Sequence, residues 1–240
     1  MPNNEMKIHD FGMIMQAGRV LMFHNKCKGH EYTIGGSTFL VKVENLLFAV
    51  TAKHVLENNE YHPNDVLIRY NEESRYFLPF DDMFSVDTND TEDTDHKDIV
   101  FLKVAKSHFE TTIDTGFVIE LPNKRFLPKL ECDQLLITGF PKDISEIDYD
   151  IKSIKTVRQP IMGTKPSPTA YKGMYTFKYA QNNANGLNLN GLSGSPVFCL
   201  NDTDNSYRIE GMLIRRNLYL SIDIISQYLY EISRRATLSC

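Results

Sequence analysis

Short apolar segments separated by turn residues recur along almost the whole chain, and this spacing limits the folds that it can adopt. In residues 37–44, Phe39, Val41 and Val43 alternate with residues of the opposite face, which is typical of a half-buried strand. Each segment is short and rich in β-branched or aromatic residues, which favours strand over helix. Strands are predicted at residues 19–24, 37–44, 46–50, 65–71, 98–104, 134–140, 174–179, 196–200 and 208–214. Regularly spaced short strands predict an all-β barrel or sandwich.

Two segments depart from the strand pattern. A short helical turn is predicted at 52–57 and a C-terminal helix at 221–234, where apolar residues recur at helical spacing. Turn residues in 111–129 separate two strand-rich blocks, and residues 164–171, with two prolines, are predicted as an irregular loop. Two β-barrels of about 100 residues each fit the number of strands. The predicted units are an N-terminal extension at 1–16, a first barrel at 17–112, a linker at 113–130, a second barrel at 131–220 and a C-terminal helix at 221–240.

The charge of the chain argues against nucleic acid as a partner. Its 240 residues have a net charge of −5 and a pI of about 5.8, and the basic residues are scattered. A surface that binds nucleic acid needs a basic stripe that neutralises phosphates. No segment approaches the roughly 20 apolar residues of a membrane span. We therefore expect neither nucleic acid nor a membrane as a partner.

The four cysteines, Cys27, Cys132, Cys199 and Cys240, are far apart and form no recognisable framework. The first ten residues contain no apolar signal core. A chain of this length buries enough surface to fold without disulfides. The pattern predicts free thiols and a cytoplasmic, reducing location.

Three short segments contain the residue types of nucleophilic catalysis. His54 lies in residues 51–55 directly after an apolar strand, Asp98 opens another, and Ser193 lies in the small-residue turn at 191–197. A serine hydroxyl becomes nucleophilic when a neighbouring imidazole accepts its proton, and an aspartate fixes the tautomer of that imidazole. The segments therefore predict Ser193 as nucleophile, His54 as general base and Asp98 as the residue that orients the base.

The small residues of the third segment suit an oxyanion hole. Backbone N–H groups of Gly191 and Ser193 are expected to point at the oxyanion that forms on the substrate. Each such donor typically contributes roughly 3 kcal/mol of transition-state stabilisation. This chemistry requires no cofactor, and we expect no metal.

The three segments resemble the signature blocks of the trypsin-like (chymotrypsin-fold) serine peptidases, Thr-Ala-Ala-His, Asp-Ile-Ala-Leu and Gly-Asp-Ser-Gly-Gly-Pro, in that fold's order of His, Asp and Ser. Residues 34–41 and 137–141 are similar to the Gly-Ser-Gly-Phe and Gly-Tyr-Pro segments of bacterial members, and 210–214 resembles the strand that lines their substrate cleft. The resemblance is to the bacterial intracellular type. It implies two six-stranded antiparallel β-barrels with the site between them, and peptide-bond hydrolysis through an acyl-enzyme on a protein or peptide substrate.

Three departures from the family pattern affect this interpretation. Leu192 stands where secreted members carry the aspartate that pairs with a newly cut N-terminus, so that pairing cannot activate this chain. Val55 replaces a cysteine and Ser195 replaces a glycine. Lacking that activation device, the chain is expected to be regulated by a protein partner.

Substrate-binding positions follow from the same resemblance. Leu187 is expected at the base of the primary pocket, which argues against a simple preference for Arg or Lys. Arg215 and Arg216 lie where the extended substrate strand runs and favour acidic substrate side chains. The alternative is that both are solvated charges at a sheet edge.

Other hypotheses remain open. His24, Cys27 and His30 are close enough in sequence for zinc but have no evident partner pair, so a hairpin loop is the alternative. The acidic residues of 81–98 are expected on a solvated loop, with a calcium site or a docking surface for a basic partner as alternatives. A second function hypothesis is a protease-fold module that binds peptides with a misaligned triad. A third is an esterase-like hydrolase that uses the same groups.

Overall fold

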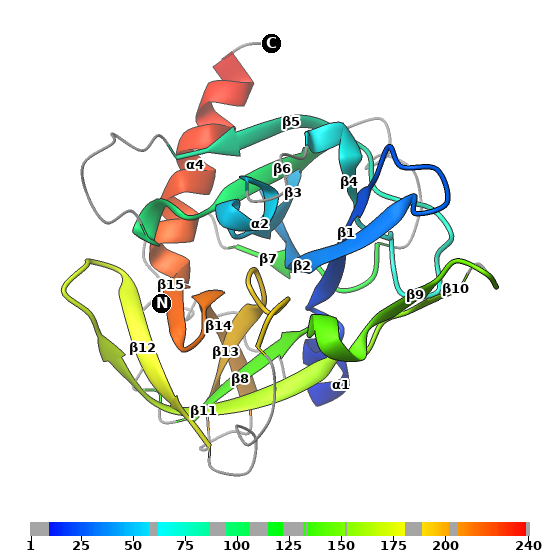
Figure 1. Cartoon of the computed structure of the whole chain (residues 1–240). Coiled ribbons are helices and arrows are strands. Elements are labelled where there is room, and N and C mark those ends of the chain that lie inside the picture. The colour runs from blue at the N-terminus through cyan, green and yellow to red at the C-terminus, as the bar shows by residue number, and fades with distance from the viewer. Residues whose placement is uncertain are drawn as a thin grey trace.

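Two β-sheet lobes, stacked one above the other in Figure 1, make up the molecule. The first lobe contains strands β1 to β7 and the second contains strands β8 and β11 to β15. The computed structural model describes residues 10–57, 62–86, 95–105, 115–121, 132, 134–151, 153–180, 189–201 and 206–238. This mostly β architecture with a C-terminal helix confirms the predicted fold class.

The first lobe is a seven-stranded sheet with the order β4-β1-β2-β3-β6-β5, and β7 pairs in parallel with β2. Its strands are β1 (Arg19–His24), β2 (Tyr32–Val43), β3 (Leu46–Thr51), β4 (Val66–Leu67), β5 (Phe80–Ser85), β6 (Val100–Val104) and β7 (Ile119–Glu120). Phe39, Val41 and Val43 of β2 are fully buried, but Leu40 on the opposite face is fully buried as well. Most of β2 is therefore buried on both faces, and the half-buried strand predicted from the alternation is wrong.

The first lobe differs from the closed six-stranded barrel that the resemblance implied. Its two edge strands, β4 and β5, do not pair with each other, so the described part of the lobe is a half-barrel. Of the predicted strand at 65–71, only Val66 and Leu67 (β4) pair regularly, with β1, because the chain turns back after them. Two backbone hydrogen bonds, from Leu78 to Ile68 and from Tyr70 to Tyr76, form that turn and lead the chain into β5.

The second lobe is a closed six-stranded barrel with the order β11-β12-β15-β14-β13-β8, as the resemblance implied. All of its strand pairs are antiparallel. Its strands are β8 (Gln134–Gly139), β11 (Gln159–Pro168), β12 (Met174–Tyr179), β13 (Pro196–Asn201), β14 (Ser206–Arg215) and β15 (Leu218–Ser221). A separate hairpin of β9 (Glu146–Asp148) and β10 (Ser153–Lys155) extends from this lobe.

The prediction of an irregular loop at 164–171 is wrong for its first half, which belongs to β11. Pairing with β8 ends at Thr164, and the register with β12 shifts between Thr164 and Ser167. Pro166 lies in that irregularity, where a missing N–H interrupts no regular ladder. Proline in a strand is tolerated at such a bulge, and the sequence alone does not show where one occurs.

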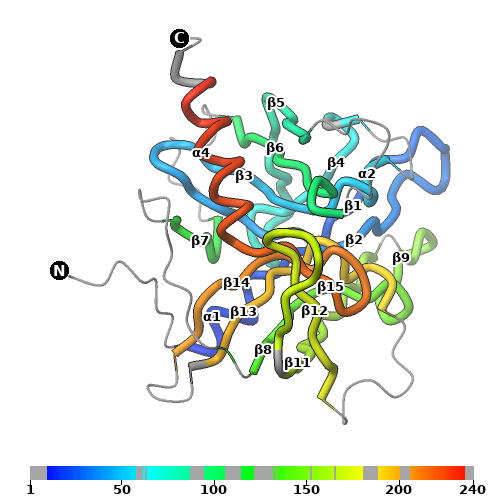
Figure 2. The backbone as a smooth tube through the Cα atoms, turned by 90° about the vertical axis from the view of Figure 1, so that its left-hand side faces the viewer, coloured from blue at the N-terminus to red at the C-terminus, as the bar shows by residue number. Residues whose placement is uncertain are grey.

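Helices connect and cover the lobes. The long C-terminal helix, α4 (Ile222–Leu238), contacts β14 and β15 of the second lobe and β2 of the first. Figures 1 and 2 show it rising from the second lobe along the side of the first. Among the described residues, the shorter helices are α1 (Phe11–Met15), α2 (Lys53–Glu57) and the 3-10 turns η1 (Pro63–Asp65), η2 (Asp95–Lys97) and η3 (Lys142–Ile144). Because α4 buries Ile225 and Leu229 completely, it fastens the two lobes together.

The hydrophobic core is continuous between the lobes. Phe39 and Phe48 of the first lobe belong to the same buried cluster as Phe198 and Met212 of the second. The residue boundaries predicted for the two units stay a prediction. The short strand β7 lies within the predicted linker, and α1 within the predicted N-terminal extension.

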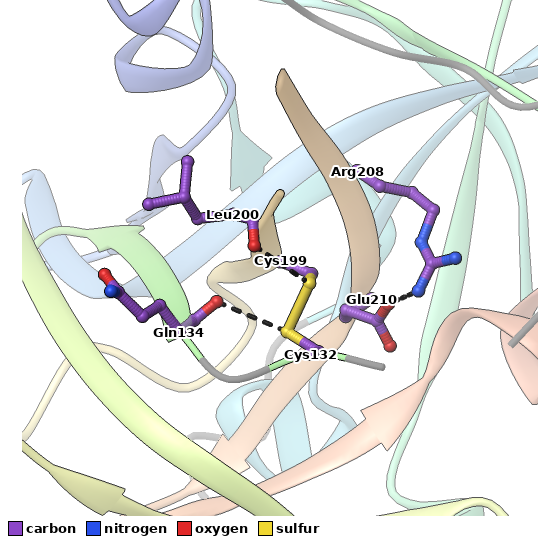
Figure 3. The surroundings of a disulfide bond; sticks show 6 residues. All are labelled: Cys132, Gln134, Cys199, Leu200, Arg208 and Glu210. Carbon is purple, nitrogen blue, oxygen red and sulfur yellow. Dashed lines mark hydrogen bonds and ion pairs between the residues drawn. A yellow bond between two sulfur atoms is a disulfide. The ribbon is translucent and has the colours of Figure 1, made fainter. Parts of the chain in front are cut away.

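A disulfide joins Cys132 to Cys199, which corrects the prediction of free thiols (Figure 3). Cys199 lies on β13, opposite Leu135 of the neighbouring strand β8, so the antiparallel register brings Cys132 close to it. The two cysteines are 67 residues apart in sequence, and their spacing gives no sign of this pairing. Cys27 is exposed and not in a disulfide, and Cys240 lies outside the described residues. A cytoplasmic location stays a prediction, and this disulfide weakens the argument from free thiols.

None of the helices in the described ranges is long and apolar enough to cross a membrane. In the same part of the chain, no three metal-ligating side chains gather at one point. The two histidines of the zinc hypothesis pack against tyrosine rings. The ring centroids are 5.7 Å apart for His24 and Tyr32 and 4.8 Å apart for His30 and Tyr149.

Candidate active site

The fold places His54 and Asp98 side by side. His54 is the second residue of α2, which follows β3 closely, and Asp98 lies just before β6, the antiparallel neighbour of β3. Oδ1 of Asp98 accepts a hydrogen bond of 2.8 Å from the main-chain amide of His54, and Oδ2 lies 2.6 Å from the Nδ1 atom of its ring. The carboxylate therefore fixes both the backbone and the ring of His54.

This contact determines which ring nitrogen of His54 is available. An ionised carboxylate can only accept hydrogen bonds, so Nδ1 carries the hydrogen and Nε2 remains an acceptor. The side chain of His54 is 34% exposed, whereas that of Asp98 is 17% exposed. A partly exposed imidazole with a free acceptor, held by a more buried aspartate, is the arrangement that a general base requires.

Ser193 lies in a turn whose shape depends on two glycines. Gly191 and Gly194 have φ angles of 93° and 87°, in the left-handed region that other residues rarely adopt. The amide of Ser195 donates to Leu192 O at 2.9 Å. The turn leads directly into β13, whose closed barrel holds it in place.

The amides of this turn divide into two groups. Those of Leu192, Gly194 and Ser195 donate to carbonyl groups of the protein. Among the described residues, no acceptor receives the amides of Gly191 and Ser193. An oxyanion hole needs a pair of free N–H donors next to the nucleophile. The unoccupied amides of Gly191 and of the partly exposed Ser193 match such a pair.

Ser37 of β2 connects this turn to the first lobe, and the sequence did not identify it. Its amide donates to the carbonyl of Ser193 at 3.0 Å. Its hydroxyl donates to the carbonyl of Gly191 at 2.8 Å and accepts from the amide of Phe140 at 2.9 Å. Ser37 is fully buried, so these hydrogen bonds are shielded from water. Its partners are 103 to 156 residues away in sequence, and no local pattern marks the contact.

Close packing explains the small residues on both sides of the turn. A Cβ atom on Gly194 would lie 2.0 Å from the carbonyl oxygen of Ser37 and 2.4 Å from Oγ1 of Thr51. A Cβ atom on Gly139, at the end of β8, would lie 2.0 Å from Oγ of Ser195. The glycines of the Ser-Gly and Gly-Phe-Pro segments are therefore required because backbone and side chains approach closely there.

Leu192 packs where the family pattern has a charged residue. It is 1% exposed and belongs to a buried cluster with Leu135, Ile137 and Val197 of the second barrel. Burying a leucine side chain contributes roughly 1.5–3 kcal/mol, and this packing holds the turn without an ion pair. The conformation of the turn thus depends on apolar packing and on Ser37.

The serine turn and the histidine helix meet at Gly36. A Cβ atom on Gly36 would lie 3.2 Å from the carbonyl oxygen of Ser193 and 3.2 Å from a methyl group of Val55, the residue after His54. The structure therefore brings all three predicted triad residues to one region of the interface between the lobes. Between the two described residues Ser193 and His54, no hydrogen bond joins the hydroxyl to the ring.

The predicted substrate-binding residues have different surroundings. Arg215, at the end of β14, forms an ion pair with Asp95 of η2, three residues before Asp98. Beside it, the ring of His96 stacks on Tyr171 with centroids 6.3 Å apart. These two contacts cross from one lobe to the other next to Asp98, and the sequence predicted neither. Leu187 lies outside the described residues.

Arg216 lies in the turn between β14 and β15. Its φ angle is 44°, and its carbonyl accepts a hydrogen bond of 2.5 Å from the hydroxyl of Tyr179. Burial raises the pKa of Tyr179 to about 12, so this hydroxyl keeps its proton at neutral pH. The turn is therefore held from β12, while the side chain of Arg216 is exposed.

Comparison with known proteins gives no family for this chain. No protein-family model matches the sequence, and no curated protein matches it. The closed barrel and the half-barrel are compatible with a chymotrypsin-like fold.

Proposed function

We propose that this chain is a serine endopeptidase that hydrolyses peptide bonds through an acyl-enzyme. Ser193 is the nucleophile, His54 Nε2 accepts its proton and returns it to the leaving amine, and Asp98 holds the ring of His54. The observation that carries the proposal is the pair of unoccupied amides at Gly191 and Ser193, beside a histidine whose tautomer a carboxylate fixes.

The reaction follows from these groups. Ser193 Oγ attacks the substrate carbonyl carbon while its proton moves to Nε2 of His54, and the resulting oxyanion accepts hydrogen bonds from the two amides. The proton then passes to the amine as the peptide bond breaks. A water molecule then gives its proton to His54 as it attacks the acyl carbon. The ester bond breaks, the acid product leaves, and Ser193 regains its proton from His54.

A latent or non-catalytic protease-fold module that binds peptides is the alternative. The missing hydrogen bond between the Ser193 hydroxyl and His54 favours it. Catalytic hydrogen bonds are often long in proteins without substrate and shorten on binding, so this observation is compatible with both functions.

Labelling with a fluorophosphonate probe separates the two functions. The purified chain is compared with Ser193→Ala and His54→Ala, and with Ser195→Ala as a matched serine in the same turn. We expect labelling of the wild type and of Ser195→Ala, and its loss in the other two variants. A folded wild type that the probe does not label would overturn the peptidase proposal in favour of the binding module.

A further inference from the structure

A cavity of about 680 Å³ lies between the lobes and includes none of the triad residues. Arg19, Arg69 and Phe117 line it from the first lobe, and Phe140, Lys155 and Arg158 from the second. Its volume is within the roughly 300–1,000 Å³ of small-molecule sites. The proposed peptidase function does not use it.

The charge of the cavity is positive. Four cationic side chains line it, together with the two carboxylates Glu72 and Glu73. Arg158 forms an ion pair with Glu72, which leaves an excess of positive charge. Lys155 is exposed at the rim, and Arg69 forms no ion pair with any described residue.

Unused hydrogen-bond donors accompany this charge. The Nε atoms of Arg69 and Arg158 are buried, and neither has an acceptor in the described part of the chain. A guanidinium whose N–H groups are not all hydrogen-bonded within the protein favours a nearby anion, because the oxygen atoms of a phosphate or carboxylate suit it in charge and in geometry.

The rest of the wall is apolar. Val20, Phe117, Phe140 and Ile154 line the cavity, and the guanidinium of Arg158 lies 5.3 Å from the centroid of the Phe140 ring. Aromatic and apolar walls beside a few convergent donors suit an organic anion better than a bare inorganic ion.

Phe140 also belongs to the serine turn. Its amide donates to the hydroxyl of Ser37, which in turn donates to the carbonyl of Gly191. Its carbonyl oxygen lies 2.6 Å from the position of a Cβ atom on Gly191. One residue therefore forms both a wall of the cavity and a support of the turn.

From these contacts we propose that the cavity binds a small organic anion, an aromatic phosphate or carboxylate, and that its occupancy orders the turn at 189–195 through Phe140. The oxygen atoms of the anion accept from Arg69, Arg158 and Lys155, and its ring packs on Phe117 and Phe140. The effect on catalysis rests on the proposed peptidase function, whereas binding and ordering do not.

Calorimetric titration with phenyl phosphate, benzoate and phenol at 150 mM salt tests the site. We expect one saturable site for the two anions and none for phenol, and the tighter of the two anions identifies the preferred group. Arg69→Gln and Lys155→Gln should each weaken binding about tenfold or more, since each removes a charge-assisted contact. Arg75→Gln, an exposed arginine outside the cavity, should leave the affinity unchanged.

Hydrogen exchange tests the ordering without needing activity. With the bound anion, amides of 189–195 should exchange more slowly, and the Arg69→Gln protein at the same ligand concentration should show a smaller change. The site would be overturned if phenol bound as tightly as the anions, or if neither anion bound saturably. It would also be overturned if Arg75→Gln lowered the affinity for the anion as much as Arg69→Gln. Saturable binding without any change in exchange would overturn the ordering. Since a Ser193→Ala protein serves equally well, both results are independent of whether the chain is a peptidase.

Discussion

The hydroxyl of Ser37 donates a hydrogen bond of 2.8 Å to the carbonyl of Gly191, across the interface between the two lobes. This contact orients the peptide plane that begins the serine turn, and the amide of Ser37 holds the carbonyl of Ser193 at the other side. The position of the two free amides therefore depends on a residue of the first lobe.

Ser37→Ala is expected to slow fluorophosphonate labelling by about 10²-fold, because a displacement on the order of 1 Å in a catalytic group has that effect. It also leaves the carbonyl of Gly191 and the amide of Phe140 without a buried partner, so the free energy of unfolding should fall by about 2 kcal/mol or more. Labelling rates and urea unfolding measure the two effects.

Ser195→Ala is the matched control for that variant. Ser195 is also fully buried, but its hydroxyl has no hydrogen-bond partner among the described residues. Its removal should leave labelling unchanged and the free energy of unfolding equal or slightly higher. If Ser37→Ala labels as fast as Ser195→Ala, Ser37 does not position the turn.

Asp98→Asn is expected to lower the labelling rate by about 10⁴-fold without unfolding the protein. An asparagine can present its NH₂ group to the ring of His54, and Nδ1 then becomes the acceptor and Nε2 the donor. The ring keeps its place but loses the tautomer that accepts the serine proton.

Asp82→Asn controls for the loss of one carboxylate in the same lobe. Asp82 forms an ion pair of 3.0 Å with Lys103 and, within the described part of the chain, makes no hydrogen bond or ion pair with His54. Its labelling rate should equal that of the wild type. A rate for Asp98→Asn within about tenfold of wild type would contradict the assigned role of Asp98.

The sequence predicts best where a local period decides the structure. The segments 19–24 and 174–179 are strands with the predicted bounds, and a helix covers 222–234 as expected. The strand β5 was missed because Asp81 and Asp82 are exposed on an edge strand and interrupt any apolar alternation.

The candidate site divides in the same way. The contact between His54 and Asp98 was predicted because both residues lie in recognisable segments at strand ends. The contacts of Ser37 and Asp95 and the disulfide were not predicted. In each case the tertiary fold brings together two residues that are far apart in the sequence. Such contacts leave no trace in the local spacing of residues.

Gly139→Ala is expected to destabilise the protein by about 1–3 kcal/mol, because the added methyl group would lie 2.0 Å from Oγ of Ser195. In the Ser195→Gly background the same change should cost less, since the clashing hydroxyl is gone. A double-mutant cycle in urea measures this coupling. Additive effects of the two changes would show that the two residues do not limit each other.

The ion pair between Arg215 and Asp95 should contribute little stability, because the side chain of Arg215 is 59% exposed. Arg215→Gln is therefore expected to change the free energy of unfolding by less than about 1 kcal/mol. Its effect should instead be on specificity, with cleavage of a peptide carrying Glu before the scissile bond reduced relative to its Gln counterpart.

Asp95→Asn gives the opposite test of the same contact, since it releases Arg215 for an acidic substrate. The ratio of kcat/KM for the Glu and Gln peptides should rise in Asp95→Asn and fall in Arg215→Gln. An unchanged ratio in both variants would support the alternative that Arg215 is a solvated edge charge.

The disulfide between Cys132 and Cys199 closes a loop of 67 residues, so its loss should destabilise the protein by about 4 kcal/mol in the chain-entropy account. Urea unfolding of the oxidised and reduced wild type measures the difference, and the double variant Cys132→Ala/Cys199→Ala should match the reduced protein. Cys27→Ala is the control, because Cys27 is exposed and outside the bond. A non-reduced digest that contains no peptide linking the two cysteines, together with equal midpoints with and without reductant, would show that the bond does not form in solution and would restore the prediction of free thiols.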